Sequence, residues 1–378
     1  MSVWDDVVGQ AAAVDVLRAA TLSPEAMTHA WLITGPPGSG RSNAARAFAA
    51  ALQCEAGGCG HCQACTTSLA GTHADVTVVA TEKVTISIEE VRDLIGLAQR
   101  TPSQGRWRVI VLEDADRMVE RTSNVLLKAI EEPPPRTVWL LCAPSPQDVV
   151  VTIRSRCRGV ALRIPPVADV VALLVSRDGV DPEVADVAAR AAQSHIGLAR
   201  RLARDPQARE RRARTLNLAA TIRGVGDAVL AAGDLVEVAT AESKAATEDR
   251  DAAEKAALLH TLGAEGGQTL PPSLRAQVRQ LEDEQKRRAT RAQRDVLDRS
   301  LTDLLSFYRD VLVVQLGADV ALVNAAQEAD VRRVAAEGRA EQTIRRMDAI
   351  GEARTRLAGN VAPLLAMEAM AVALRPQG

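Results

Sequence analysis

A glycine-rich segment near the N-terminus limits the possible folds more than any other part of the sequence. Its residues are Gly35, Pro36, Pro37, Gly38, Ser39, Gly40, Arg41 and Ser42, which fit the phosphate-loop pattern G-x-x-x-x-G-K-[ST] everywhere except at Arg41. In such a loop the backbone N–H groups surround a phosphate, and the following helix adds the positive end of its dipole. The sequence therefore predicts a nucleotide-binding loop, and a chance glycine-rich turn is the less favoured alternative.

Arg41 stands where a phosphate loop normally carries lysine. The lysine ammonium is compact, whereas the guanidinium is larger, planar and fork-shaped. We expect at most weak binding of ATP or ADP, with Mg²⁺ ligated by Ser42. Accurate stabilisation of a transferring phosphoryl group is not expected.

The acidic residues that follow a buried strand are also unusual. The apolar run Val109–Leu112 ends in Glu113 and Asp114. A hydrolytic site of this kind usually has Asp first, for Mg²⁺, and Glu second, to polarise water. The reversed order displaces each carboxylate, and Mg²⁺ demands near-ideal octahedral geometry. An acidic strand end without a catalytic role is about equally well supported.

Apolar runs of strand length alternate with helical patterns over the first 165 residues. The expected strands are Ala30–Thr34, Val109–Leu112 and Val138–Cys142, with weaker candidates at Val76–Ala80 and Val160–Leu162. Helices are expected at Ser42–Leu52, Ile88–Gln99 and Ser123–Ile130. Runs that are apolar on both faces fit a parallel sheet covered by helices on both sides. The predicted fold class is therefore α/β for this part of the chain.

The remainder of the chain is expected to be helical. With 378 residues the chain is too long for one compact core. Its four Trp all lie in the first 140 residues, and a remainder without Trp fits packed helices better than strands. Short helices are expected at Val167–Ser176, Pro182–Ser194 and Gly197–Arg204, and long ones after Asp205-Pro206. Glycines and prolines between Gly263 and Pro272 predict a break before a charged helix that starts near Ser273. We predict domains at 1–164, 165–208 and 209–378.

Four cysteines lie within twelve residues, at Cys54, Cys59, Cys62 and Cys65. Tetrahedral Zn²⁺ is commonly held by four thiolates on a tight turn rich in glycine. Because four ligands leave no open position for water, the predicted Zn²⁺ site is structural. Four free thiols in a loop are the less favoured alternative.

Charge and hydropathy bear on location and partners. The net charge is −2, so no global field attracts nucleic acid or an anionic membrane. No run of 18 apolar residues is present, and the N-terminus lacks the basic-then-apolar pattern of a secretion signal. We expect a cytoplasmic protein with no membrane partner. A basic run on the charged helix comprises Lys286, Arg287, Arg288, Arg291 and Arg294; a salt-bridged, solvated helix is favoured over a nucleic-acid patch.

Several motifs in order resemble those of the AAA+ clamp-loader subunits of bacterial DNA polymerase III. They are Trp4–Gln10, His29–Gly35, Asn124–Pro133, Thr152–Cys157, Gly197–Arg200 and, more weakly, Asn360–Glu368. The resemblance implies a RecA-like ATPase core with a zinc module, a small helical lid, and a helical collar that joins five subunits. It also implies that Arg156 reaches into the ATP site of a neighbouring subunit and that Arg200 senses phosphate in the lid.

The chain looks most like the delta-prime type of clamp-loader subunit. Family ATPases carry a polar sensor, usually Thr, at a strand end where this chain has Ala143 and Pro144. Together with Arg41 and the Glu113-Asp114 order, this departure predicts a non-hydrolysing subunit whose own ATPase is weak or absent. The implied partners are gamma/tau and delta subunits in a pentamer, the sliding clamp and primer-template DNA. The alternatives are an active gamma/tau-like ATPase and a stand-alone nucleotide-regulated binding module.

Overall fold

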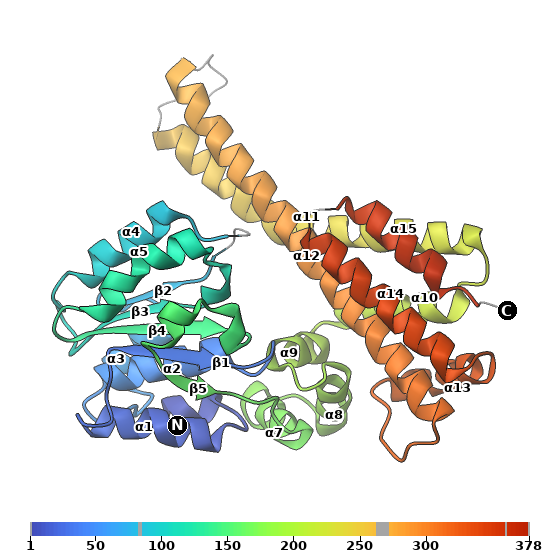
Figure 1. Ribbon diagram of the computed structural model, residues 1–378, viewed down its shortest axis with the longest axis horizontal. Helices are drawn as coiled ribbons and strands as arrows, with labels where there is room; N and C mark the ends of the chain where they lie inside the picture. Colours follow the sequence, from blue (N-terminus) through green and yellow to red (C-terminus); the bar gives the residue numbers. More distant parts are fainter. Residues whose placement is uncertain (1, 82–84, 262–271, 360, 377–378) are drawn as a thin grey trace. The chain divides into compact units, whose positions relative to one another are not determined.

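The computed structural model describes every residue except 1, 82–84, 262–271, 360 and 377–378. It divides the chain into two compact units, Met1–Asp205 and Pro206–Gly378 (Figure 1). The finer division at residues 164 and 208 stays a prediction, and the predicted break at Gly263–Pro271 lies outside the described residues. No helix in the described part of the chain is both long and apolar enough to cross a membrane.

The first unit is built on a five-stranded parallel sheet with the strand order β2-β3-β4-β1-β5. The strands are β1 (Ala30–Thr34), β2 (Val76–Val79), β3 (Arg108–Leu112), β4 (Thr137–Ala143) and β5 (Arg158–Ala161). Every residue of β1, β3 and β4 is buried, which explains their uninterrupted apolar runs. The edge strand β5 begins two residues before its predicted start, at exposed Arg158 and Gly159. All five predicted strands are confirmed.

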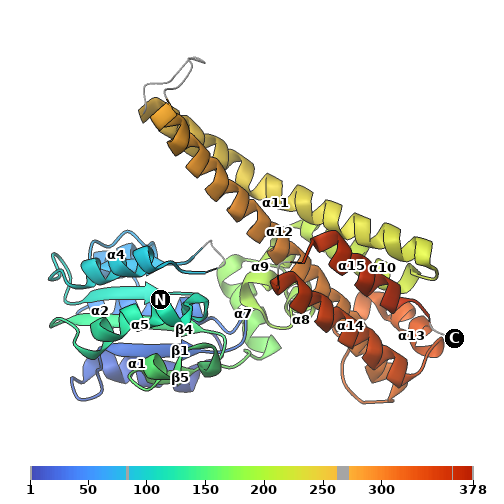
Figure 2. The same ribbon diagram turned by 45° about the horizontal axis from the view of Figure 1, so that its top comes forward.

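Alternate residues of the strands enter two separate cores, one on each face of the sheet. Trp31 and Ile33 pack on one face with α1 (Ala11–Leu22) and α2 (Arg41–Gln53). Leu32 and Trp139 pack on the other with α4 (Ile88–Ala98) and α5 (Glu120–Glu131). Figures 1 and 2 show the sheet between these two helical layers. The predicted α/β architecture is thus confirmed.

Three short helices end the first unit. They are α7 (Val167–Asp178), α8 (Pro182–Ala191) and α9 (Ile196–Arg204). The start of α8 is fixed by Asp181, whose side chain accepts hydrogen bonds from the amides of Glu183 and Val184. The smaller elements of the unit are η1 (Val3–Asp6), α3 (Gln63–Leu69), η2 (Ala115–Arg117), η3 (Pro146–Asp148) and α6 (Val151–Arg154).

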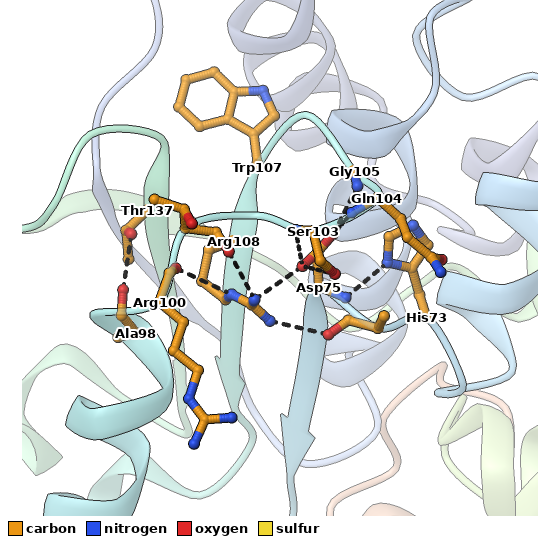
Figure 3. Close-up of polar contacts among 12 residues, drawn as sticks. His73, Asp75, Ala98, Arg100, Ser103, Gln104, Gly105, Trp107, Arg108 and Thr137 are labelled. Atoms are coloured by element: carbon orange, nitrogen blue, oxygen red, sulfur yellow. Dashed lines mark hydrogen bonds and ion pairs between the residues drawn. The ribbon is translucent and has the colours of Figure 1, made fainter.

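A buried ion pair lies at the amino ends of β2 and β3 (Figure 3). Arg108 Nη2 lies 2.9 Å from Asp75 Oδ1, and the Asp75 side chain is fully buried. Asp75 also accepts hydrogen bonds from the amides of Ser103, Gln104 and Gly105. Burial alone would raise the pKa of Asp75, but these amide donors outweigh it and lower the pKa to about 2. The loop before β3 is therefore held to the sheet by a charged anchor.

All regular secondary structure in the described residues of the second unit is helical. Its elements are α10 (Pro206–Thr221), α11 (Val225–Thr261), α12 (Pro272–Gln315), η4 (Ala325–Gln327), α13 (Glu328–Ala336), α14 (Ala340–Ala358) and α15 (Pro363–Leu374). One apolar cluster includes residues from all five of the long helices and from α13. This observation confirms the predicted all-helical region that follows the α/β part.

The long helices α11 and α12 form a hairpin whose two ends differ in character (Figure 2). The buried apolar cluster ends at Ala239 on α11 and begins at Val296 on α12. Beyond these residues the helices are joined by ion pairs, in which Arg288 contacts Asp251 and Glu254 at 3.0 Å. We call this part, residues 240–261 and 272–295, the arm. The ion pairs of Arg288 agree with the salt-bridged helix predicted for the basic run.

Candidate nucleotide site, metal centre and surface arginine

The phosphate loop follows β1, with β4 and β5 on either side of that strand. The amide of Gly35 donates to the carbonyls of Ala143 and Pro144, at 3.4 and 3.2 Å. Gly38 and Gly40 have φ angles of +86° and +88°, which a residue with a side chain adopts only with strain. The glycines of the motif are therefore used for backbone geometry, and α2 starts directly after them at Arg41.

Arg41 forms a hydrogen bond within its own loop. Its Nη1 donates a hydrogen bond to the carbonyl oxygen of Gly35. The sequence interpretation gave no role to Asp116, although it lies in the same acidic segment as Glu113 and Asp114. Burial raises the pKa of the Asp116 carboxyl, while the charge of Arg41 acts in the opposite direction. The guanidinium thus contacts a backbone oxygen of the loop that it belongs to.

Both predicted acidic residues have partners within the chain. The Glu113 carboxylate lies 2.8 Å from Nε of Arg46 on α2. Asp114 accepts a hydrogen bond from the amide of Thr81 at 3.1 Å and lies 3.5 Å from Nε of Arg117. No role was predicted for Arg46, although it is the one charged residue inside an otherwise small and apolar helical stretch. This arrangement neutralises the acidic strand end from inside the chain.

Gly38 and Ser39 of the loop are contacted by other parts of the first unit. A Cβ atom at Gly38 would lie 2.6 Å from Cγ of His195, the residue that caps α9. The Gln10 side chain donates to the carbonyls of Ser39 and Arg163, at 3.2 and 2.6 Å. Ser39 Oγ is buried and has no hydrogen-bond partner in the described part of the chain. His195 was given no role from the sequence, and Gln10 was singled out only as part of the Trp4–Gln10 motif, because both come close to the loop only through the fold.

Arg200 lies in α9, five residues after the N-cap residue His195. Its Nε is 2.6 Å from the carboxylate of Asp178, at the end of α7, and Arg204 shares the same carboxylate at 3.0 Å. The ion pair of Arg200 with Asp178 therefore links α9 to α7. A phosphate-sensing role for Arg200 stays a prediction, as do the roles of Pro36, Pro37 and Ser42 in nucleotide binding.

Arg156 lies at the surface on the turn between α6 and β5. Its side chain is 39% exposed, and Nη2 lies 2.5 Å from the carboxylate of Glu131. Nη1 donates to the Thr152 carbonyl at 2.8 Å and to Ser155 Oγ at 3.4 Å. The guanidinium is therefore both accessible and held in place.

The four cysteines converge as predicted. Their sulfur atoms all lie within 4.8 Å of one another, and those of Cys54 and Cys62 are 3.7 Å apart. Sulfurs that share a tetrahedral Zn²⁺ are separated by roughly 3.8 Å, given a Zn–S bond of about 2.3 Å. Burial opposes ionisation of Cys54, but amide donors including those of Cys59 and Gly58 lower its pKa to about 6. The cluster can hold a metal ion.

The turn that carries the four cysteines also anchors the N-terminal residues. The carbonyl of Gly58 accepts hydrogen bonds from the Val3 amide at 3.1 Å and from Ser2 Oγ at 3.0 Å. Trp4 Nε1 donates to the Gly57 carbonyl at 3.2 Å. A Cβ at Gly58 would lie 2.6 Å from Cγ2 of Val3, so only glycine allows this close approach.

Comparison with known proteins supports the resemblance expected from the motifs. Residues 9–166 match a family model described as "DNA polymerase III, delta subunit". A relative, DNA polymerase III subunit delta' of Pseudomonas aeruginosa, is 40% identical over 146 residues, which are 37% of this chain and 44% of that protein. The resemblance to clamp-loader subunits is confirmed over this stretch, which contains the phosphate loop, the four cysteines and Arg156.

Relatives of a second type also match a part of the chain. DNA polymerase III subunit tau of Escherichia coli is 36% identical over 156 residues, which are 40% of this chain and 24% of that protein. The matches thus span less than half of the length of these relatives. A solved Thermotoga maritima protein related to the DNA polymerase III gamma subunit covers 96% of this chain and 98% of its own, with 15% identity and a TM-score of 0.43.

Proposed function

We propose that this chain, whose residues 9–166 match the DNA polymerase III delta-subunit family, is a subunit of a bacterial clamp loader. In this proposal it works in the cytoplasm with gamma/tau and delta subunits in a pentamer, and the complex loads a sliding clamp onto primer-template DNA. The all-helical second unit is the collar that joins the subunits, and α7, α8 and α9 form the lid. The four cysteines hold a structural Zn²⁺.

Within the complex we assign the chain to the delta-prime type, which does not hydrolyse ATP. The observation that carries this assignment is the ion pair between Glu113 and Arg46, at 2.8 Å. A carboxylate that must ligate Mg²⁺ or polarise water cannot do so freely while it neutralises an arginine of its own chain. Arg41, bound to the Gly35 carbonyl, and the Ala143-Pro144 strand end support the same assignment. Any ATP or ADP is expected to bind weakly.

Arg156 supplies the chemistry that this chain's own pocket lacks. An exposed arginine given to a neighbouring subunit can stabilise the charge on a transferring γ-phosphate, which is worth about 10³–10⁵ in rate in related NTPases. Arg156 fits this role because its guanidinium lies at the surface and is already oriented by Thr152 and Ser155.

The test is an Arg156→Ala variant in the complex reconstituted with gamma/tau and delta subunits of the same organism. The variant should lower DNA-stimulated ATP turnover, because one site loses its arginine, while size-exclusion chromatography shows an intact complex. Arg154→Ala is the matched control, since Arg154 ends α6 two residues before Arg156 and donates instead to the carbonyl of Pro146 in η3. Unchanged turnover of the Arg156 variant would refute the proposal.

The alternative is an active ATPase of the gamma/tau type, which the match to tau subunits favours. It is separated from the delta-prime assignment by an ATPase assay of the isolated chain. Turnover that is abolished by Glu113→Gln or Asp114→Asn would establish the alternative. We expect no turnover above background, and weak binding of labelled ATP and ADP.

A further inference from the structure

We infer that Glu131 is a positioning residue for Arg156: its carboxylate holds the guanidinium in the orientation that a neighbouring ATP site requires. This inference rests on the proposed function and adds a residue to it. It starts from one contact, the 2.5 Å distance between Glu131 Oε1 and Arg156 Nη2.

The two partners of this ion pair come from different elements, and each element is anchored in the same core. Glu131 is the last residue of α5 and follows Ile130, which is fully buried. Arg156 follows α6, whose Ile153 is also fully buried. Both isoleucines belong to the apolar cluster on one face of the sheet. The backbone positions of the carboxylate and of the arginine are thus fixed relative to each other.

The polar contacts of Arg156 leave part of its guanidinium available. Nη1 donates hydrogen bonds to the Thr152 carbonyl and Ser155 Oγ, and Nη2 forms an ion pair with Glu131. A guanidinium has five N–H donors in a fixed planar fork. Within the part of the chain that the structure describes, the hydrogen bonds and the ion pair of Arg156 do not involve Nε. The bound donors therefore set the plane of the group, and the remaining edge can meet a phosphate oxygen.

Glu131 has two opposing effects on an incoming phosphate. Its negative charge repels the phosphate. Its contact with Nη2, however, restricts the Arg156 side chain beforehand, so less side-chain entropy is lost when the guanidinium meets the phosphate. Both side chains are about 40% exposed, so water screens the charge effect. The contact of Glu131 with Nη2, at 2.5 Å, is direct and is screened less than its longer-range repulsion of a phosphate. We therefore expect the orienting effect to dominate.

The experiment uses the reconstituted complex with the variants Glu131→Ala and Glu131→Gln. Loss of a half-exposed pair of this kind should lower kcat for DNA-stimulated ATP hydrolysis by about two- to five-fold. The KM for ATP and the assembly of the complex should not change, because Arg156 acts only when charge develops at the phosphate. Glu131→Gln keeps a hydrogen-bond acceptor for Nη2 and should restore most of the rate. Glu132→Ala, at the next exposed position, is the matched control and should behave as wild type.

The outcomes separate this inference from the proposed function. If Arg156→Ala lowers turnover and Glu131→Ala does not, the inference about Glu131 fails and the proposed function stands. If neither variant changes turnover, the proposed function fails. A rise in turnover with Glu131→Ala would show that the carboxylate restrains Arg156, and would overturn the positioning role. The NMR signal of Arg156 Nε–H in the isolated chain should broaden in Glu131→Ala but not in Glu132→Ala, which tests the hold on the guanidinium without any enzymatic readout.

Discussion

Replacing Asp75 with asparagine removes the charge from the buried anchor at the sheet edge. The pKa of Asp75 is lowered from 3.8 to about 2, and each unit of pKa shift corresponds to about 1.4 kcal/mol. The ionised carboxylate therefore contributes about 2 kcal/mol to the free energy of unfolding. Asparagine also leaves the Arg108 guanidinium without its counter-charge, although Arg108 keeps the carbonyls of Ala74 and Thr101 as acceptors. We expect a total loss of about 3 kcal/mol, towards the lower end of the cost of breaking a buried pair.

The pH dependence of this loss follows from the direction of the shift. Because the folded state holds the proton of Asp75 less tightly than the unfolded state, the contribution is fully present above the unfolded pKa of 3.8 and disappears as the pH falls through about 2. About half of the charge contribution should remain at pH 3. The difference in stability between wild type and Asp75→Asn should shrink over this range.

Urea unfolding followed by tryptophan fluorescence measures the effect in the right part of the molecule. All four Trp lie in the first unit, so the signal reports on the unit that contains Asp75. Asp93→Asn, on an exposed position of α4, is the matched control and should change stability by less than about 0.5 kcal/mol. Equal stability losses for the two variants, or a loss for Asp75→Asn that does not vary between pH 7 and pH 3, would refute the reasoning.

Three further predictions concern the metal centre and the arm. Gly58→Ala should destabilise the first unit by about 2 kcal/mol more than Gly71→Ala in the same unfolding assay, because both have positive φ but only the first lacks space for a Cβ. Cys65→Ser should abolish stoichiometric zinc measured by atomic emission after dialysis, and retained zinc would exclude the four-thiolate site. Arg288→Ala should accelerate hydrogen exchange in the arm at low salt, whereas Lys286→Ala should not, since Lys286 is more than three-quarters exposed and its ion pair is with Asp283 on its own helix.

The sheet could be predicted because its central strands are buried on both faces. Such strands are apolar without interruption, and β1 is found at the predicted residues, Ala30–Thr34. Edges and helix starts carry weaker signals. The strand β5 begins at exposed residues. The helix α5 begins three residues before its predicted start, and the sequence does not mark this start because the N-cap residue, Val119, offers no side-chain hydrogen bond.

The candidate site could be predicted only where its residues are close in the sequence. The phosphate loop and the cysteine cluster each occupy a dozen residues or fewer, so spacing alone indicates their chemistry. The pair of Arg46 and Glu113 joins residues 67 positions apart, and His195 meets Gly38 across 157. Such contacts depend on how α2 and α9 lie on the sheet, and no local pattern encodes them. Arg156 was identified from the motif around it and not from its chemistry.

The change from apolar to ionic contacts along the α11–α12 hairpin bears on how its length can evolve. Deleting matched helical turns beyond Ala239 and before Val296 removes no member of the apolar cluster. Ion pairs on helix surfaces can be lost or regained one at a time, at a small cost for each. The bundle core cannot change in this way, because a single missing side chain leaves a cavity. Related chains should therefore differ in the length of the arm while the bundle beneath it keeps its dimensions.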